Sequence, residues 1–395
     1  MLISKKIRLI PTKDQEIIFR KSAGVARWAY NYFLNEQEKT YAEYLLNNKS
    51  GTRFVDEGDI RKYINNVLKP NTHTWLKEVG SNVMKMGVKD ANDAYKRFFK
   101  GTAKRPRFKS KRNSKMSFYV NYESLVKKPN GFYGEKIGFV KTSEPLPKIQ
   151  KGKKYSNPRI SFDGKYWYLS VGYDVPETKD GLSGESLGVD LGIKELAVCS
   201  DGVVYGNINS SKRVKQLKKR LKREQRKLSR MMTANTVGYK TVGSKRYPVW
   251  KRPLKDCSNI QKQNRVIRLI HRKLSNIRNN YLHQTTTEIV KTKPSRIVME
   301  TLNVTGMMKN KHIAERIAEQ KFYEFKRQIK YKSALRGIEV VEVDQWFPSS
   351  KTCSHCGSKK RMLKLSDRIF KCDICGFEID RDLNASINLA NYVAA

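Results

Sequence analysis

One acid interrupts an otherwise apolar strand in the stretch Leu187-Gly188-Val189-Asp190-Leu191-Gly192-Ile193. A buried carboxylate without a partner is costly, so something cationic should meet Asp190. A salt bridge at the end of the strand explains this residue equally well when it is taken alone. The same question arises at Glu300, which ends the buried strand Ile297-Val298-Met299.

A third acidic position lies near the C-terminus. Asp380 and Asp382 flank Arg381 ahead of the segment Leu383-Asn384-Ala385-Ser386-Ile387-Asn388. An aspartate at this point commonly caps the N-terminus of a helix, so each acid also has a purely local explanation.

The order of the elements around these acids indicates the fold class. We expect strands at 187–190, 196–199, 203–205, 296–299 and 338–343, and helices at 211–232, 259–291, 312–336 and 382–392. This order is typical of an α/β RNase H-like fold that carries a helical insertion. In that fold the first and fourth strands are adjacent and the last helix begins beside them. We then expect three acids to converge: Asp190, Glu300 and one of Asp380 and Asp382. Three carboxylates at one point form a site for two divalent metal ions, which can hydrolyse phosphodiesters. A glutamate at the end of a middle strand, with an aspartate opening the last helix, is the RuvC arrangement.

Four of the six cysteines form two CxxC pairs with 15 residues between the pairs. This pattern predicts a zinc ribbon in which four thiolates hold one structural Zn²⁺. A redox role would need only one CxxC pair. We expect His355 to be a solvated spacer or a phosphate contact, and Cys199 and Cys257 to be core or incidental residues. The predicted ligands are Cys353, Cys356, Cys372 and Cys375.

The charge balance points to a polyanionic partner. The chain has 395 residues, with 81 Lys and Arg against 37 Asp and Glu, which gives a net charge of +44. Such a field repels itself unless nucleic acid neutralises it. No run approaches about 18 apolar residues and the N-terminus lacks the apolar region of a signal peptide, so we expect a cytoplasmic protein without a membrane span.

Two basic segments are candidates for contact with nucleic acid. Residues 97–115 carry nine basic side chains and no acid, and this segment could also be a flexible arm. The helix at 212–230 carries eleven Lys and Arg and one acid, Glu224, whereas an ordinary solvated face mixes both signs. The candidate contacts on this helix are Lys218, Lys219, Lys222 and Arg223.

Four motifs occur in a fixed order: GVDLGIKELAVCSDG, IVMETLNVTGM, CSHCG with CDICG, and DRDLNASINLAN. In this order they resemble TnpB, the RNA-guided nuclease family of bacterial and archaeal insertion sequences, which is related to type V CRISPR effectors. The resemblance is specific over residues 187–395 and looser over 1–100. It implies that Asp190, Glu300 and Asp382 are the catalytic residues, because the family motif begins at the second aspartate. Ser386 departs from the family's usual alanine.

The resemblance also implies a domain plan. A RuvC nuclease domain would span 187–346 and 380–395, with a zinc ribbon inserted at 347–379. A linker would occupy 181–186. The N-terminal part would be a wedge-like β-barrel, 1–11 and 101–180, interrupted by a helical recognition domain at 12–100.

The implied function is RNA-guided cleavage of double-stranded DNA beside a short flanking motif, with Mg²⁺ or Mn²⁺ at a single site that cuts both strands. The protein would work as a monomeric ribonucleoprotein with its guide RNA. Asn82 and Lys85, near the start of a helix at 75–99, could read the flanking motif, although ordinary exposed helix residues look the same. Three alternatives remain open: a compact type V CRISPR effector, a non-cleaving RNA-guided repressor, and a basic RNA-binding protein with a zinc ribbon. A repressor predicts a broken acidic triad, and a simple RNA-binding protein leaves the three acids unexplained.

Overall fold

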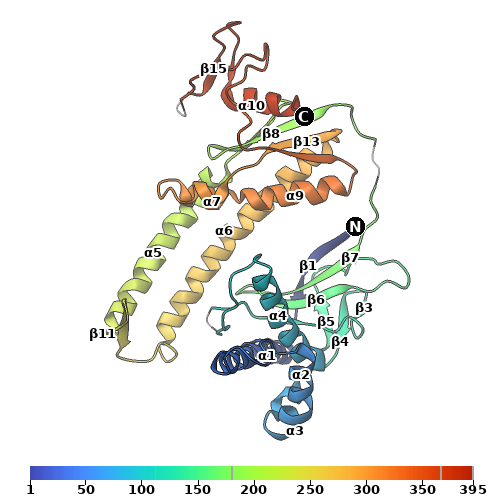
Figure 1. Ribbon diagram of the computed structural model, residues 1–395, viewed down its shortest axis with the longest axis vertical. Helices are drawn as coiled ribbons and strands as arrows, with labels where there is room; N and C mark the ends of the chain where they lie inside the picture. The colour runs from blue at the N-terminus through green and yellow to red at the C-terminus, as the bar shows by residue number, and fades with distance from the viewer. Residues whose placement is uncertain (112, 179–180, 365–366, 394–395) are drawn as a thin grey trace. The chain divides into compact units, whose positions relative to one another are not determined.

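The structure, a computed structural model, describes residues 1–111, 113–178, 181–364 and 367–393. The chain divides into two compact units, Met1–Val175 and Pro176–Ala395 (Figure 1). Each unit has its own hydrophobic core. No helix within the described ranges is long and apolar enough to cross a bilayer.

The first unit is built on a seven-stranded antiparallel sheet, in the order β2-β6-β7-β1-β5-β4-β3. The central strand β1 pairs with β7 along most of its length and with β5 at its end. β2 and β3 are the two edges, and within the described ranges no pairing between them closes the sheet, so the expected β-barrel is not shown. Its expected boundary at residue 180 lies outside the described residues. The strands are β1 (Leu2–Ile10), β2 (Ser117–Tyr119), β3 (Val126–Lys128), β4 (Gly131–Gly134), β5 (Gly138–Thr142), β6 (Ser156–Phe162) and β7 (Trp167–Asp174).

Helices cover this sheet, beginning with α1 (Lys13–Leu46). Thr12 and Gln15 form a capping box that starts α1 directly after Pro11. The helix packs on the sheet through Phe19, whose ring lies 5.1 Å from that of Trp167. The other helices are α2 (Glu57–Tyr63), the π-turn η1 (Ile64–Leu68), α3 (Lys69–Asn71), the 3₁₀ turn η2 (Thr74–Glu78) and α4 (Ser81–Phe99). The helix expected from residue 75 therefore begins as a 3₁₀ turn and becomes α-helical only at Ser81.

The second unit contains a five-stranded mixed sheet in the order β10-β9-β8-β13-β14. Its strands are β8 (Ser186–Leu191), β9 (Glu195–Cys199), β10 (Val204–Gly206), β13 (Arg296–Glu300) and β14 (Glu339–Val343). The first and fourth strands, β8 and β13, are parallel neighbours, with Val189 opposite Met299. This adjacency confirms the expectation drawn from the order of elements.

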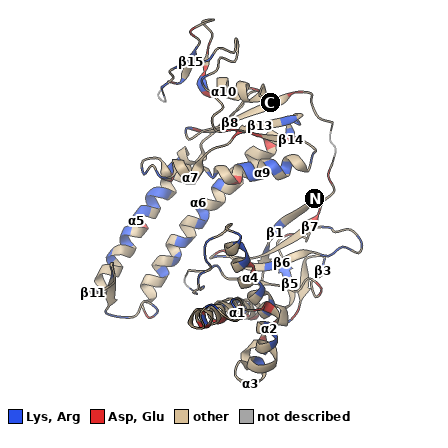
Figure 2. Cartoon of the chain, viewed as in Figure 1, with Lys and Arg blue, Asp and Glu red and all other residues tan. Residues whose placement is uncertain are grey.

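A long helical hairpin leaves the sheet after β10 and returns before β13 (Figure 1). It consists of α5 (Lys212–Ala234) and α6 (Ser258–Lys291), preceded by the 3₁₀ turn η3 (Ile208–Ser210). The two helices pack through Val214, Leu217, Ile270 and Leu274. A small antiparallel ribbon, β11 (Thr236–Val242) and β12 (Lys245–Trp250), joins their far ends and was not expected from the sequence. Lys and Arg residues are distributed along both helices (Figure 2).

The remaining elements follow β13 in the chain. They are α7 (Val304–Met307), α8 (Ala314–Gln320), α9 (Phe322–Ala334), β15 (Ile369–Lys371), β16 (Glu378–Asp380) and α10 (Arg381–Ala390). The single helix expected at 312–336 is wrong, because the chain breaks at Lys321, which adopts a left-handed conformation with φ of 56°. Fully buried Phe322 and Phe325 of α9 pack against the sheet core.

Candidate active site and metal centre

Two neighbouring parallel strands end in the first two acids. Asp190 lies near the end of β8 and Glu300 is the last residue of β13. Val189 and Met299 face each other in the register, so the two acids follow at the next position on both strands. Burial raises the pKa of Asp190 well above its usual range, and the nearby carboxylates of Glu300 and Asp382 raise it further. The structure therefore brings all three acids into one electrostatic neighbourhood.

The two aspartates at the start of α10 have different roles. Asp380 is the N-cap: its Oδ1 accepts hydrogen bonds from the backbone N–H of Asp382 at 2.9 Å and of Leu383 at 3.1 Å. The role of helix cap, which the sequence allows for either aspartate, therefore belongs to Asp380. The carboxylate of Asp382 lies in the first turn and acts on the pKa of both Asp190 and Glu300.

Helix α10 packs unusually closely on β8. A Cβ atom added at Gly188 would lie 1.9 Å from the carbonyl oxygen of Ser386 and 2.5 Å from the backbone nitrogen of Ala390. Only glycine leaves room for the helix backbone here. Ser386 is itself fully buried and its hydroxyl donates to the Leu383 carbonyl at 2.8 Å, so the departure from alanine is accommodated inside the helix. This contact fixes the distance between the strand that carries Asp190 and the helix that carries Asp382.

The three carboxylates offer the oxygen ligands that divalent cations prefer in proteins. No hydrogen bond or ion pair to any of their oxygens occurs within the described parts of the chain. Burial also raises the pKa of Glu300, which the ammonium group of Lys326 opposes, and Lys326 itself pairs with Glu342 at 3.5 Å. Partly buried acids that repel one another gain most from a metal ion. Their oxygens are not all within 4.8 Å of one another, a spacing that only the cysteine cluster reaches among the described residues.

The four predicted cysteines form that cluster. Their Sγ atoms all lie within 4.8 Å of one another, with Cys353 to Cys375 at 3.8 Å and Cys356 to Cys372 at 3.6 Å. Tetrahedral zinc with Zn–S bonds of about 2.3 Å requires sulfur atoms about 3.8 Å apart, so the cluster fits Zn²⁺. The backbone N–H of Cys375, with the Ser358 hydroxyl, lowers the pKa of Cys372 to about 5, which favours the thiolate.

The other predicted residues of this region behave as packing groups. The ring of His355 stacks on Phe377, with centroids 5.3 Å apart. Cys199 is a core residue of the sheet, and the buried Cys257 stands immediately before α6. None of the three is a member of the cysteine cluster.

Two asparagines that were not predicted from the sequence join the ribbon to α10. The side chain of Asn384 is fully buried; it donates to the Thr352 carbonyl at 2.7 Å and accepts from the backbone N–H of Ser354 at 2.9 Å. Asn388 donates to the carbonyls of Ser349 and Thr352. The sequence did contain a signal for this contact: two asparagines lie four residues apart on the apolar face of the helix. Buried side-chain amides need hydrogen-bond partners, so a docked segment could have been expected there. The first CxxC knuckle is thereby attached to the helix that begins at Asp382.

The four basic candidates on α5 are not equivalent. Lys218 is ion-paired with Glu315 at 3.0 Å and with Glu319 at 2.8 Å, and these contacts raise its pKa. Glu319 also binds Arg278 of α6 at 2.8 Å, so Lys218 belongs to a network that joins α5 to α6 and α8. The exposed face carries instead a group of neighbouring basic residues that line a surface depression: Lys219, Lys222, Arg223, Arg226 and Arg230.

Asn82 and Lys85 both lie in the first turns of α4 and are partly exposed. Asn82 lines a small depression that also includes Glu135. The carboxylate of Glu135 accepts a hydrogen bond from the backbone N–H of Ser81 at 3.3 Å and so caps this helix. The structure gives neither residue a contact that distinguishes base recognition from ordinary exposure.

Three family models match successive parts of the chain. They are OrfB_IS605, described as "Probable transposase", over residues 170–311; the Cas12f1-like TNB domain over 322–389; and a helix-turn-helix domain of OrfB_IS605 over 1–45. In the structure, the last of these ranges is a strand followed by the single helix α1.

Bacterial proteins are among the relatives that match nearly the whole chain. InsQ of Escherichia coli (strain K12), which is named as an RNA-guided DNA endonuclease, is 28% identical over 97% of this chain and 90% of its own length. A protein of the same description from Streptomyces pristinaespiralis is also 28% identical, over 97% of this chain and 87% of its own. Among solved structures, Cas12f1 in a cryo-EM complex with sgRNA and target DNA covers 99% of both chains, at 15% identity and a TM-score of 0.56, which shows a shared fold. The chain belongs to the TnpB/OrfB family of IS605-type elements, which is related to Cas12f.

Proposed function

We propose that this chain is an RNA-guided DNA endonuclease in which Asp190, Glu300 and Asp382 are the catalytic carboxylates. The observation that carries the proposal is that the carboxylates of Glu300 and Asp382 raise the pKa of Asp190 and that Asp382 also raises the pKa of Glu300, while no cation of the described residues forms an ion pair with any of the three. The near full-length similarity to relatives named as RNA-guided DNA endonucleases supports the guide RNA and the DNA substrate. A non-cleaving repressor is less well supported, because it needs none of the three acids.

Asp190, Glu300 and Asp382 would hold Mg²⁺ or Mn²⁺. Such ions supply an activated water and stabilise the leaving oxygen of a phosphodiester. The chain's own contribution is to fix the three carboxylates on elements that cannot move independently. β8 and β13 are hydrogen-bonded neighbours, and α10 lies against β8 at Gly188. We propose that the same site cuts both strands, after a short flanking motif has been recognised.

The finer domain plan is part of the proposal. A nuclease domain of residues 187–346 and 380–395 would contain the ribbon at 347–379, and 181–186 would be its linker. A helical recognition domain at 12–100 would interrupt a barrel formed by 1–11 and 101–180. The four cysteines that fit zinc and the five-stranded sheet support the C-terminal part of this plan. A monomeric ribonucleoprotein is the proposed working form.

A matched pair of isosteric variants tests the catalytic assignment. Asp382→Asn should reduce DNA cleavage more than about 10²-fold, because it removes a charge that stabilises the transition state. Asp380→Asn should cleave nearly as the wild type does, since asparagine caps a helix as well as aspartate. Both variants should retain binding of guide RNA and target DNA. An Asp382→Asn protein with undiminished cleavage in Mg²⁺ would overturn the assignment, as would a fully active Glu300→Ala protein.

A further inference from the structure

Trp346 follows strand β14, at the edge of the sheet where the acids meet. Strands β8, β13 and β14 run parallel, so their carboxyl ends share one edge. Val343 ends β14 opposite Glu300, and the backbone N–H of Thr301 donates to the Val343 carbonyl at 2.8 Å. Trp346 comes three residues later. Its Cα atom therefore lies within about 16 Å of that of Glu300, since neighbouring strands are about 5 Å apart and each further residue spans at most about 3.6 Å.

The segment that carries Trp346 returns over the face of the sheet to which the acids belong. Successive side chains of a strand point to opposite faces, so Glu300 shares a face with Val298. Val298 packs with Leu389 of α10 in a small apolar cluster, and Phe347 packs against this cluster. Trp346 is thus the immediate neighbour of a residue that is anchored on the acid-bearing face.

The backbone around Trp346 is held on both sides. The N–H of Trp346 donates to Oδ1 of Asp344 at 2.8 Å, and the N–H of Phe347 donates to the Asp344 carbonyl at 3.1 Å. The ring of Phe347 meets that of Tyr392 edge to face, with centroids 5.1 Å apart. The direction in which the indole leaves the chain is therefore fixed by its neighbours.

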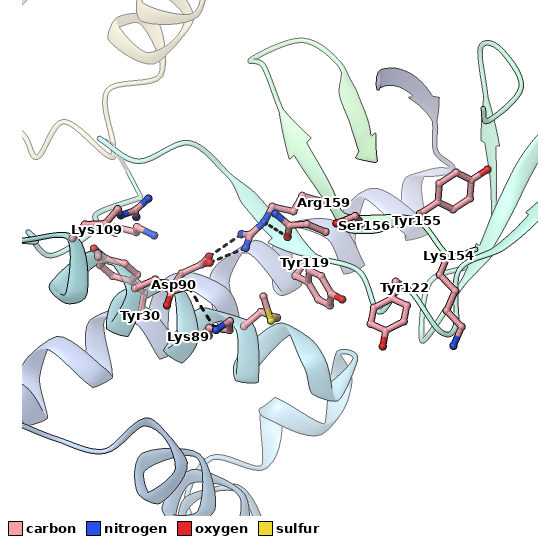
Figure 3. A pocket seen from close by; sticks show the side chains of 15 residues that line it. Tyr30, Lys89, Asp90, Lys109, Tyr119, Tyr122, Lys154, Tyr155, Ser156 and Arg159 are labelled. Carbon is pink, nitrogen blue, oxygen red and sulfur yellow. Dashed lines mark hydrogen bonds and ion pairs between the residues drawn. The ribbon is translucent and has the colours of Figure 1, made fainter. Parts of the chain in front are cut away.

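The indole itself is uncovered. Trp346 is 82% exposed, whereas each of the other four tryptophans is at most 38% exposed. Tyrosines elsewhere in the chain already have a cation against a ring face. The Nζ atom of Lys109 lies 3.5 Å from the centroid of the Tyr30 ring, and that of Lys154 lies 5.3 Å from the Tyr122 ring (Figure 3). No ring or cation of the described residues lies against Trp346. A flat ring that covers the indole would remove a large apolar surface from water.

A DNA strand with one phosphate at the acids passes within reach of this indole. A separation of about 16 Å corresponds to about five nucleotides at the spacing of about 3.4 Å that one strand has in B-DNA. Unpaired bases stack on aromatic rings whatever their identity. Bases inside a duplex are already covered on both faces by their neighbours. An exposed indole at this place therefore favours a single strand without reading its sequence.

We propose that Trp346 stacks on an unpaired base of the DNA strand that is being cut, within about five nucleotides of the phosphate at the three acids. The stack holds the strand in the site and makes the site select single-stranded over duplex DNA. This inference rests on the proposed function, from which it takes the DNA strand and its cleavage at Asp190, Glu300 and Asp382.

Single-turnover cleavage by the guide-loaded protein tests the stack. One abasic nucleotide is placed in turn at each of about five positions on either side of the cut. We expect one position to slow the wild type about 10-fold, because an abasic nucleotide has no ring to stack. Trp346→Leu should melt as the wild type does, cut intact DNA about 10-fold more slowly, and show no further loss at that position.

Two further variants are controls. Trp346→Phe keeps an aromatic ring and should retain most of the rate. Tyr239→Leu removes another exposed ring, at the far end of the α5–α6 hairpin, and should respond to the abasic nucleotides as the wild type does. Equal rates of the wild type and Trp346→Leu on intact DNA would overturn the inference. So would a Trp346→Leu protein that still loses the full factor at the sensitive position, because the two losses would then be independent.

Photocrosslinking gives a measurement that needs no cleavage. The Asp382→Asn protein is loaded with guide RNA and with target DNA that carries 5-iodouracil at successive positions of the displaced strand, and mass spectrometry locates the adducts. We expect an adduct at Trp346. The absence of a Trp346 adduct at every position would count against the stack even if the wild type cuts DNA. An adduct at Trp346, with a wild type that cuts no DNA in Mg²⁺, would overturn the proposed function alone.

Discussion

Replacing Gly188 by alanine should separate catalysis from binding. The new Cβ atom would lie 1.9 Å from the Ser386 carbonyl oxygen, so α10 has to move outward by roughly 1.5 Å to restore ordinary contact. Asp382 is four residues before Ser386 on the same helix and must move with it. Misplacing a catalytic group by about 1 Å costs about 10²-fold in rate, and overpacking costs about 1–3 kcal/mol in stability.

Cleavage of a plasmid target by the Gly188→Ala protein, measured beside its melting temperature and its RNA binding, checks this reasoning. We expect cleavage to fall about 10²-fold while RNA binding stays within a few-fold of the wild type. Gly184→Ala is the matched control, because a Cβ atom there has nothing within 4 Å. A Gly188→Ala protein that cuts DNA and melts as the wild type does would refute the view that this close approach sets the position of Asp382.

Other predictions address the ribbon, the basic helix and pH. Asn384→Leu should reduce cleavage at least 10-fold with one zinc per chain retained in elemental analysis, whereas Cys372→Ser should lose both zinc and cleavage but less of its RNA binding. Lys219→Gln should reduce, by about 1, the slope of a plot of the logarithm of the RNA-binding constant against the logarithm of the salt concentration. Lys218→Gln breaks an internal ion pair, so it should leave that slope unchanged and lower the melting temperature. Burial lowers the pKa of Lys332 from 10.5 to about 8, so between these pH values the unfolded chain binds this proton more tightly than the folded chain does. The free energy of unfolding should therefore rise between pH 8 and 10.5. Thermal unfolding of a Lys332→Met protein should not show this rise.

Much of the second unit could be predicted because its signals are local. The apolar stripe of α6 placed that helix correctly, and Ile267, Ile270 and Leu274 are buried as the pattern indicates. The adjacency of β8 and β13 followed from the order of elements alone. The CxxC spacing predicted the cluster of four sulfur atoms, because two knuckles can point their thiolates at one metal.

The parts that failed depend on contacts between distant segments. Nothing local to Lys218 distinguishes it from Lys219; only the position of Glu319, about 100 residues later in the chain, makes it an internal ion pair. The left-handed turn at Lys321 breaks a pattern that otherwise reads as one helix. The residues alone did not decide between Asp380 and Asp382; the resemblance to the family favoured Asp382, and the hydrogen bonds that make Asp380 the helix cap are compatible with that choice.

The helical hairpin of α5 and α6 also gives the protein a place where a further chain segment can be inserted. Both helices join the sheet at their near ends, and a 23-residue helix carries its far end about 35 Å away from there. The ribbon at that end turns at Gly243, and Tyr239, Val242 and Tyr247 around it are exposed. Chain inserted at an exposed turn of this kind perturbs little of the packed structure. A second protein fused into the turn would therefore be carried by the nuclease without entering the sheet edge where the acids meet.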